Sequence, residues 1–256
     1  MTSDKADLEA RIRARKWFYR YQLPSGASTE LYIRPEVEPI HTTRLAMLFA
    51  VLEPIASGAW GDLSCLDLAC HEGFFAIHLA LRGCRPVLGI DARPEHVSNA
   101  DLIRDLYGLS GLRFQVGDVT AIRPEQLGCF DVVVLFGLLY HLENPIGVLR
   151  LAHRLTTRVC VIETQVANNL SERIDWGFHR SIQRMVGCFG LVDERAEVEN
   201  NAEASVTGIS LVPSREGLLW ALGAVGFVRA EVLAPPPDSY EQIATGKRIM
   251  IAAYPK

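Results

Sequence analysis

The residues that could support chemistry begin where a strand-like apolar run ends in a short loop. Residues 65–68, Cys-Leu-Asp-Leu, lead into Ala-Cys-His-Glu-Gly at 69–73, and a helical pattern starts at Phe74. A loop that joins a strand to a helix in this way points backbone N–H groups at a ligand. Eighteen residues after Gly73 a second apolar run ends in Asp91, the spacing expected of an acid that binds a ribose diol. Together these features predict a site for an adenosine-containing cofactor.

Polar residues also follow the later apolar runs. Asp118 comes after one run, His141 lies four residues past Gly137 at the end of the next, and Glu163 ends a third. An unperturbed imidazole is mostly neutral at pH 7, so we predict that His141 takes a proton as a general base. The alternative is that His141 only caps the helix that begins near Asn144. Glu163 either accepts hydrogen bonds from substrate hydroxyls, orients His141 or holds the following loop together.

The elements that must position these residues alternate between strand and helix. The pattern predicts strands at 64–69, 86–91, 112–116, 130–136 and 158–164, with helices at 73–82, 94–107 and 144–155. Such an alternation predicts a mainly parallel sheet with helices on both faces. Ligands of such sheets bind outside the carboxyl ends of the strands, where the candidate residues lie.

Two segments stand outside this repeat. The first sixty residues predict helices at 4–17 and 41–56, and we treat 1–60 as an N-terminal helical cap and 61–256 as the main domain. Residues 165–212 are polar and irregular, which is typical of a lid or substrate-binding insertion. A short helix is predicted there from Ile174, Phe178, Ile182 and Met185. A last helix at 214–226, capped by Ser214, leads to strands at 227–233 and 248–254.

The composition is that of an ordinary globular domain. The chain has 256 residues, of which 49% are hydrophobic and 22% charged, and no window approaches the roughly 18 apolar residues of a membrane span. The first residues do not resemble a signal peptide, and the six cysteines form no CxxC pair, so we expect reduced thiols and a cytoplasmic protein. A formal net charge of −4 gives no general reason to bind nucleic acid or an anionic membrane. The oligomeric state is left open.

A local exception to this acidic balance is the segment 11–21. It interleaves five cations with four aromatic residues, a mixture that can hold phosphates while it stacks bases. The alternative is a helix with one solvated basic face whose aromatic end packs on the domain. Trp17 and Tyr19 then either close over the ligand or lie in the core.

Four segments, in order, make the chain resemble the class I S-adenosylmethionine-dependent methyltransferases over about residues 40–256. Asp67 to Gly73 is similar to the first motif of that family, Asp91-Ala92-Arg93 to the acidic end of its second strand, and Asp118-Val119 to the acid that meets the adenine amino group. Residues 130–142 resemble its fourth motif. The resemblance implies a Rossmann-like α/β fold with a seven-stranded, mostly parallel sheet, an N-terminal helical segment and a lid insertion after the fifth strand. It implies S-adenosyl-L-methionine as cofactor, with S-adenosyl-L-homocysteine as product.

The first motif departs from this family at two positions. Where the family usually has Gly-x-Gly-x-Gly, this chain has Ala69, His71 and Gly73, and only the last glycine remains. Ala69 is acceptable if its φ stays negative, whereas the backbone of His71 must avoid strain or tolerate a left-handed conformation. The His71 ring either faces the substrate or only shapes the turn. The G-x-G-x-x-G pattern of nicotinamide enzymes is absent, which counts against a dehydrogenase.

The acceptor is the least specified part of the prediction. Residues 136–145 look like a segment of the tRNA wobble-uridine carboxymethyl-transferring enzymes, and related segments occur in bacterial small-molecule and sugar O-methyltransferases. We favour a small polar acceptor with a reactive hydroxyl, because a tRNA-binding protein should be basic over a broad face. The alternatives are (carboxy)methyl transfer to tRNA and a non-catalytic module that keeps the fold.

The predicted site therefore has one catalytic residue and two binding sets. His141 is the base, and Trp17, Tyr19, Tyr140 and Glu163 bind the substrate. No acidic cluster has convincing spacing for Mg²⁺, so no metal ligand is predicted. The cofactor-binding residues are Asp67, Ala69, Cys70, His71, Gly73, Phe74, Asp91, Ala92, Asp118, Val119, Phe136, Gly137 and Leu138.

Overall fold

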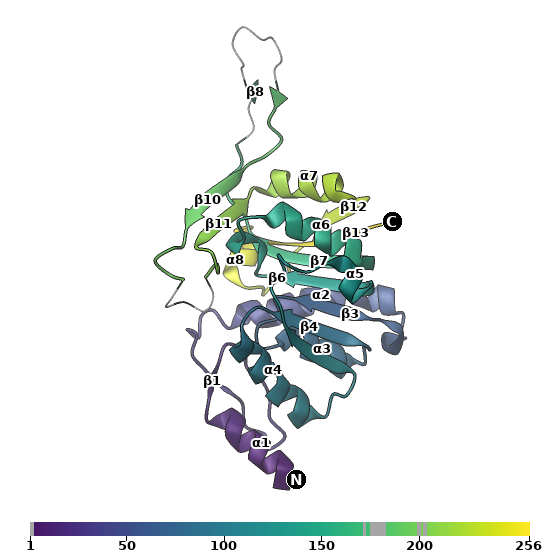
Figure 1. Cartoon of the computed structure of the whole chain (residues 1–256), viewed down its shortest axis with the longest axis vertical. Coiled ribbons are helices and arrows are strands. Elements are labelled where there is room, and N and C mark those ends of the chain that lie inside the picture. The colour runs from purple at the N-terminus through teal and green to yellow at the C-terminus, as the bar shows by residue number, and fades with distance from the viewer. Residues whose placement is uncertain (1–2, 171–172, 175–182, 199–200, 202–203) are drawn as a thin grey trace.

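A seven-stranded sheet forms the centre of the molecule (Figure 1). The computed structural model describes residues 3–170, 173–174, 183–198, 201 and 204–256. The strand order is β12 (Arg229–Val232), β13 (Arg248–Tyr254), β7 (Thr156–Gln165), β6 (Phe130–Phe136), β3 (Cys65–Leu68), β4 (Val87–Asp91) and β5 (Leu112–Val116). Neighbours from β7 to β5 are parallel, and β13 is antiparallel to both β12 and β7. The predicted mostly parallel sheet is confirmed.

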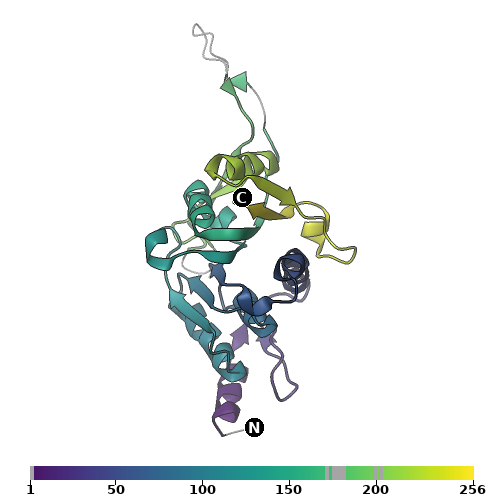
Figure 2. The same cartoon turned by 90° about the vertical axis from the view of Figure 1, so that its right-hand side faces the viewer.

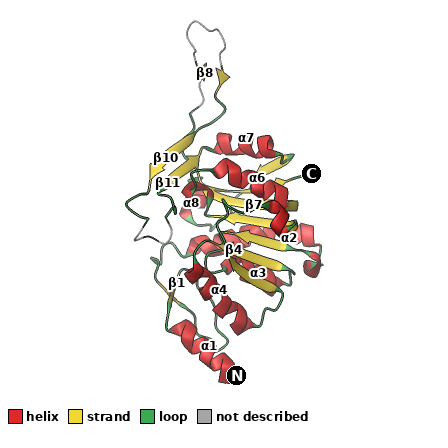
Figure 3. Ribbon diagram, viewed as in Figure 1, coloured by secondary structure: helices red, strands yellow, loops and turns green. Residues whose placement is uncertain are grey.

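Helices cover both faces of this sheet (Figures 2 and 3). Side chains alternate along each strand, so Val132 and Val134 of β6 join one apolar cluster while Val133 and Leu135 join the other. The first cluster includes residues of α2 (Pro39–Ala56), α3 (Phe74–Arg82) and α4 (Pro94–Tyr107). The second includes residues of α6 (Pro145–Leu155) and α7 (Arg215–Val225), and α5 (Pro124–Leu127) is a single turn beside α6.

The N-terminal segment differs from its prediction. The helix predicted at 4–17 ends earlier, as α1 (Ser3–Arg13), and β1 (Lys16–Trp17) then pairs in parallel with β2 (Glu30–Leu31). The reason is a period-two pattern: Trp17, Tyr19, Tyr21 and Leu23 are buried while the residues between them are more exposed, as in an extended chain. These side chains belong to the same apolar cluster as α2 and α3. The boundary between residues 60 and 61 stays a prediction.

The insertion after β7 is built from strands in the parts that the structure describes. β8 (Arg173–Ile174) pairs with β9 (Gln183–Arg184), and β10 (Phe189–Asp193) pairs with β11 (Ile209–Pro213), both antiparallel. The predicted short helix is wrong at Ile174, which lies in β8, and at Met185, which is irregular, whereas Phe178 and Ile182 lie outside the described residues. The Leu211 N–H donates to the Leu142 carbonyl at 2.9 Å and so holds β11 beside η2 (Leu139–His141).

The last third of the chain closes the sheet. Ser214 caps α7 as predicted, with its Oγ accepting from the Gly217 N–H. Shorter helices elsewhere in the described residues are η1 (Trp60–Asp62), η2 (Leu139–His141) and α8 (Glu241–Ala244). Throughout the described segments, every helix is too short or too polar to cross a membrane.

Candidate active site

A cavity of about 360 Å³ lies outside the carboxyl ends of the parallel strands. This volume is within the range of roughly 300–1,000 Å³ usual for small-molecule sites. Its lining includes Ala69 and His71 after β3, Asp91 at the end of β4, Asp118 after β5 and Gly137 after β6. Segments at the ends of four strands that the sequence singled out therefore meet at one edge of the sheet, as parallel pairing requires.

The loop at 69–73 has a left-handed backbone at alternate residues. The φ angles are +59° at Ala69, +52° at His71 and +81° at Gly73. The condition of a negative φ at Ala69 is therefore not met, and of the two alternatives for His71 its backbone takes the left-handed one. Each such non-glycine residue costs roughly 1–2 kcal/mol. The bends aim the His71 N–H at Asp91 Oδ2, 2.8 Å away, and the Cys70 N–H at the Ile90 carbonyl.

Some predicted cofactor-binding residues are buried in or beside this loop and do not line the cavity. Asp67 is buried, and its Oδ2 accepts the Ala76 N–H in the first turn of α3 at 3.1 Å. Burial raises the pKa of Asp67 to about 8. Cys70 and Phe74 are buried as well, and a Cβ on Gly73 would lie 2.5 Å from Phe114. None of these four residues lines the cavity, so their contact with the cofactor stays a prediction.

Asp91 is held by three donors. Its Oδ2 accepts from the His71 N–H, and its Oδ1 accepts from the Arg93 N–H at 3.0 Å and lies 3.1 Å from His96 Nδ1. Burial alone would raise the pKa of Asp91, but the hydrogen bonds from His96 and the Arg93 N–H outweigh it and lower the pKa. Asp91 is therefore an ionised carboxylate at neutral pH.

The His71 ring stacks on a second imidazole. The centroids of His71 and His96 are 3.7 Å apart with 25° between the planes, and both rings line the cavity. His71 Nδ1 accepts the Glu72 N–H at 2.8 Å. The ring thus fills the space at the family's second glycine position and packs beside Asp91.

Asp118 lies on the rim of the cavity and is exposed. Its Oδ1 accepts from both the N–H and the Oγ1 of Thr120 at 2.8 Å, which is the local turn cap that an acid after a strand often makes. Oδ2 is not used in these two hydrogen bonds, so the cap does not prevent Asp118 from meeting a ligand. Ala92, Val119, Phe136 and Leu138 also line the cavity.

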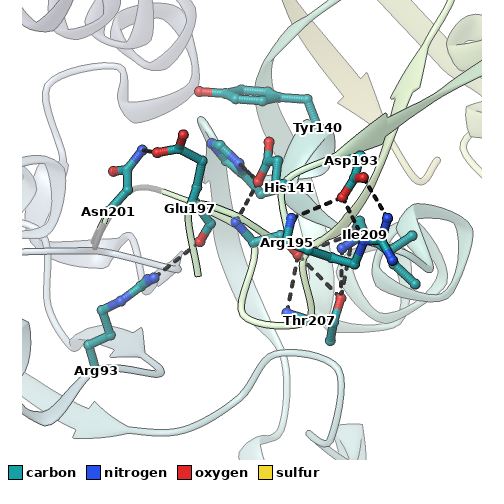
Figure 4. A network of polar contacts seen from close by, with 12 residues as sticks. Arg93, Tyr140, His141, Asp193, Arg195, Glu197, Asn201, Thr207 and Ile209 are labelled. Atoms are coloured by element: carbon teal, nitrogen blue, oxygen red, sulfur yellow. Dashed lines mark hydrogen bonds and ion pairs between the residues drawn. The ribbon is translucent and has the colours of Figure 1, made fainter. Parts of the chain in front are cut away.

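His141 forms a pair with an acid that the sequence did not single out. In η2, His141 Nδ1 lies 3.2 Å from Glu194 Oε2, and the same oxygen accepts the Ser205 N–H at 2.6 Å (Figure 4). Burial would raise the pKa of Glu194, but the hydrogen bonds from Ser205 and His141 lower it. The segment that carries Ser205 is also bound to Arg93, whose guanidinium donates to the Ala204 carbonyl at 3.1 Å. An ionised carboxylate therefore orients the imidazole.

Glu163 has a different role from those predicted for it. It is fully buried, and its carboxylate contacts Arg44 Nη2 at 2.6 Å, Arg248 Nη1 at 3.1 Å and the Gly137 N–H at 3.1 Å. Because Glu194 orients His141 and two guanidinium groups surround Glu163, we correct Glu163 from a substrate ligand to the anchor of an arginine pair.

Of the aromatic residues predicted to bind substrate, Tyr19 and Tyr140 line the cavity. Trp17 does not: its side chain is fully buried, and its indole N–H donates to the Ile12 carbonyl at 2.9 Å. We correct Trp17 to a core residue. The structure adds His41, Arg44 and Arg248 to the cavity wall. His41 and Arg44 are polar residues three apart on one face of a helix that is otherwise apolar there, which was the available signal.

No group of three or more His, Cys, Asp or Glu side chains is placed to hold a metal ion within the described ranges. Asp91 and His141 are instead paired with other side chains or with backbone N–H groups. The arrangement can accept hydrogen bonds from a diol at Asp91 and can take a proton at His141.

Known proteins are similar to this chain in sequence. A family model described as "Methyltransferase domain" matches residues 61–190. A tRNA U34 carboxymethyltransferase of Desulfotalea psychrophila is 25% identical over 180 residues, which cover 69% of this chain and 48% of that protein. A ubiquinone biosynthesis O-methyltransferase of Psychrobacter cryohalolentis is 32% identical over 102 residues, which cover 39% of each chain. The chain spans less than half the length of these curated relatives.

A solved structure matches the whole chain. The N-terminal domain of EvdMO1, crystallised in the presence of SAH and D-fucose, has a TM-score of 0.71 and 21% sequence identity. The match covers 100% of this chain and 98% of that one. The two chains therefore share a fold, including the parts outside the family model.

Proposed function

The chain belongs to the methyltransferase domain family, and from this premise we propose that it is an S-adenosylmethionine-dependent O-methyltransferase of a small polar acceptor, with His141 as the general base. The observation that carries the proposal is the His141–Glu194 pair, which opens onto the same cavity as Asp91 and the 69–73 loop. The sugar present with the EvdMO1 domain supports a sugar or natural-product hydroxyl as the acceptor.

The cavity has polar groups that fit an adenosine-containing cofactor. A carboxylate offers about four lone-pair positions, and Asp91 uses three of them within the protein, so it can still accept a ribose hydroxyl. Ala69, His71, Gly137 and Leu138 would surround the remaining part of the cofactor, and Asp118 would meet the adenine.

The chemistry at His141 is a proton transfer. S-adenosylmethionine supplies a methyl group already activated on a sulfonium. The acceptor oxygen would take this methyl group, leaving S-adenosylhomocysteine, and His141 would take the proton of the acceptor hydroxyl. Glu194 holds Nδ1, so Nε2 is the nitrogen that takes the proton, and the carboxylate stabilises the imidazolium that forms. A placed base of this kind contributes about 10² to 10⁴ in rate.

Calorimetry with S-adenosylhomocysteine tests the cofactor part of the proposal, and a screen of hydroxyl acceptors that measures S-adenosylhomocysteine formation tests the reaction. We expect saturable binding and turnover on at least one acceptor. A wild-type protein that binds no S-adenosylhomocysteine would overturn the cofactor assignment. Binding without turnover on any acceptor would favour the non-catalytic module.

A second candidate is (carboxy)methyl transfer to tRNA, which the similarity to tRNA U34 carboxymethyltransferase supports. The basic segment 11–21 offers fewer cations than its sequence suggests, because Lys16 pairs with Glu30 and Arg20 with Glu38. Titration with tRNA distinguishes the two candidates. Affinity that falls steeply with salt, as several phosphate contacts require, would support tRNA over a small acceptor.

A further inference from the structure

A pair of buried arginines forms one wall of the cavity. Arg44 comes from α2 and Arg248 from β13, and both line the cavity although each residue is less than a tenth exposed. They share a single carboxylate, Glu163, which contacts both guanidinium groups. Two cations and one anion leave a net charge of +1 in a site removed from bulk water. Buried charge of this kind is costly unless a partner neutralises it.

Polar atoms on this wall also lack partners. Arg44 Nε is buried without a hydrogen bond, and so are both ring nitrogens of His41, within the part of the chain that the structure describes. His41 lies three residues before Arg44 on α2, so both side chains project from one face of the helix into the cavity lining. Burial and the neighbouring Arg44 lower the pKa of His41 to about 2, so its ring is neutral. Buried polar atoms without partners are rare, and a bound ligand is one explanation for them beside a cavity.

The wall lies next to the base. Arg248 Nη2 donates to the Tyr140 hydroxyl at 3.0 Å, and the Tyr140 and His141 ring centroids are 4.2 Å apart. Arg248 is on β13, four strand spacings from β4, which carries Asp91. At about 4.8 Å per strand that is roughly 19 Å. The arginine pair thus lies in the part of the cavity near His141, where the acceptor must bind. It lies away from the part around Asp91.

We propose that Arg44 and Arg248, with His41 beside them, form a subsite for a carboxylate on the methyl acceptor, so that the acceptor is an acidic hydroxyl compound such as a uronic acid. A single carboxylate matches the net charge of the wall, and guanidinium groups bind carboxylates with directed hydrogen bonds. S-adenosylmethionine carries a carboxylate of its own on its methionine part, so the S-adenosylhomocysteine titrations below distinguish the acceptor from the cofactor as the ligand of this wall. This inference rests on the proposed function, because it assigns the acceptor of that reaction.

Calorimetry with glucuronate and its neutral match glucose tests the subsite, each titrated into wild-type protein with and without saturating S-adenosylhomocysteine. We expect glucuronate to bind roughly ten- to a hundredfold more tightly than glucose, the range for a charged hydrogen-bonded pair. Arg44→Gln should remove this preference and leave the affinity for S-adenosylhomocysteine within about twofold. Glu163→Gln should increase the preference, because it removes the competing carboxylate.

Arg154→Gln is the matched control, since Arg154 forms an exposed pair with Glu125 far from this wall, and it should change neither affinity. Thermal melting of Arg44→Gln and Arg44→Lys checks folding, and the lysine variant should keep part of the preference. Equal affinity of the wild-type protein for glucuronate and glucose would overturn the inference. So would a loss of S-adenosylhomocysteine affinity in Arg44→Gln as large as the loss for glucuronate, since the wall would then hold the cofactor. Failure of the wild-type protein to bind S-adenosylhomocysteine would instead reject the proposed function. The glucuronate titration in the absence of S-adenosylhomocysteine would still test whether the arginine pair binds a carboxylate.

Discussion

The 69–73 loop and the wall around His141 are built in different ways, although they face the same cavity. The loop is shaped by backbone: three left-handed residues, the His71 N–H on Asp91 and the buried Asp67 beneath the first turn of α3. The acceptor side is made of side chains from distant parts of the chain, such as His141 with Glu194 and Arg44 with Glu163. Under the proposed function, cofactor binding would depend on local backbone geometry, whereas acceptor choice would depend on pairs of residues that are distant in the sequence.

The largest effect is expected from a substitution at His141, which should change turnover and not cofactor affinity. His141→Ala should lower turnover by about 10² to 10⁴, because the base is lost, while the affinity for S-adenosylhomocysteine changes little. Steady-state rates on an acceptor found in the screen, together with calorimetry, measure both quantities. Turnover within about tenfold of the wild-type rate would reject the base and leave the cofactor assignment intact.

Glu194→Gln tests the orientation of that base. The pKa of Glu194 is lowered, so its carboxylate is ionised at neutral pH and favours the protonated imidazole. A neutral amide removes this charge, so the acid limb of the rate profile should move to lower pH while the plateau falls by about ten- to a hundredfold. A purely structural role would lower the plateau without moving the limb. Glu194→Asp, which keeps the charge, serves as the control.

Asp67→Asn tests the support of the 69–73 loop through the free energy of unfolding. Burial raises the folded-state pKa of Asp67 to about 8, above the unfolded value near 3.8. The unfolded state therefore ionises first, and the stability that this group supplies below pH 4 is lost as pH rises toward 8. The amide variant avoids this loss, so its unfolding free energy should exceed that of the wild type by about 1–3 kcal/mol at pH 8 and by little at pH 4. Urea unfolding at the two pH values measures the difference, and an equal offset at both would contradict it.

The smallest effect is expected at Ala69. Its φ of +59° is unfavourable for alanine, so Ala69→Gly should raise the unfolding free energy by about 0.5–1 kcal/mol. Ala46→Gly, at an exposed position inside α2, is the matched control and should lower it by about 1 kcal/mol. If Ala69→Gly were as destabilising as this control, the loop would not be strained in solution.

The elements with local signals could be predicted from the sequence. The helix at 94–107 and the strand at 112–116 agree residue for residue with α4 and β5, because proline, glycine and apolar periodicity mark their ends. The N-terminal helix was extended too far since its cations matched a helical pattern, while the period-two burial after Lys16 prevailed in the fold.

The residues predicted to bind the cofactor could be found because they lie at the ends of predicted strands. Glu194, His41 and Arg44 could not be found in that way. Glu194 meets His141 across 53 residues, and Glu163 binds two arginines from opposite ends of the chain. Such pairs arise only when helix α2, the β10–β11 hairpin and the sheet come together. A sequence pattern records the charge of these residues but not the partner.

Calorimetry of S-adenosylhomocysteine binding to the wild-type protein, Asp91→Ala and His141→Ala tests the central claim most directly, that one cavity holds the cofactor at the strand ends and the base on a separate wall. We expect saturable binding to the wild-type protein, a loss of roughly tenfold or more in Asp91→Ala from the missing charged hydrogen bond, and affinity within about twofold of the wild type in His141→Ala. Absence of binding to the wild-type protein, or equal losses in the two variants, would contradict the account.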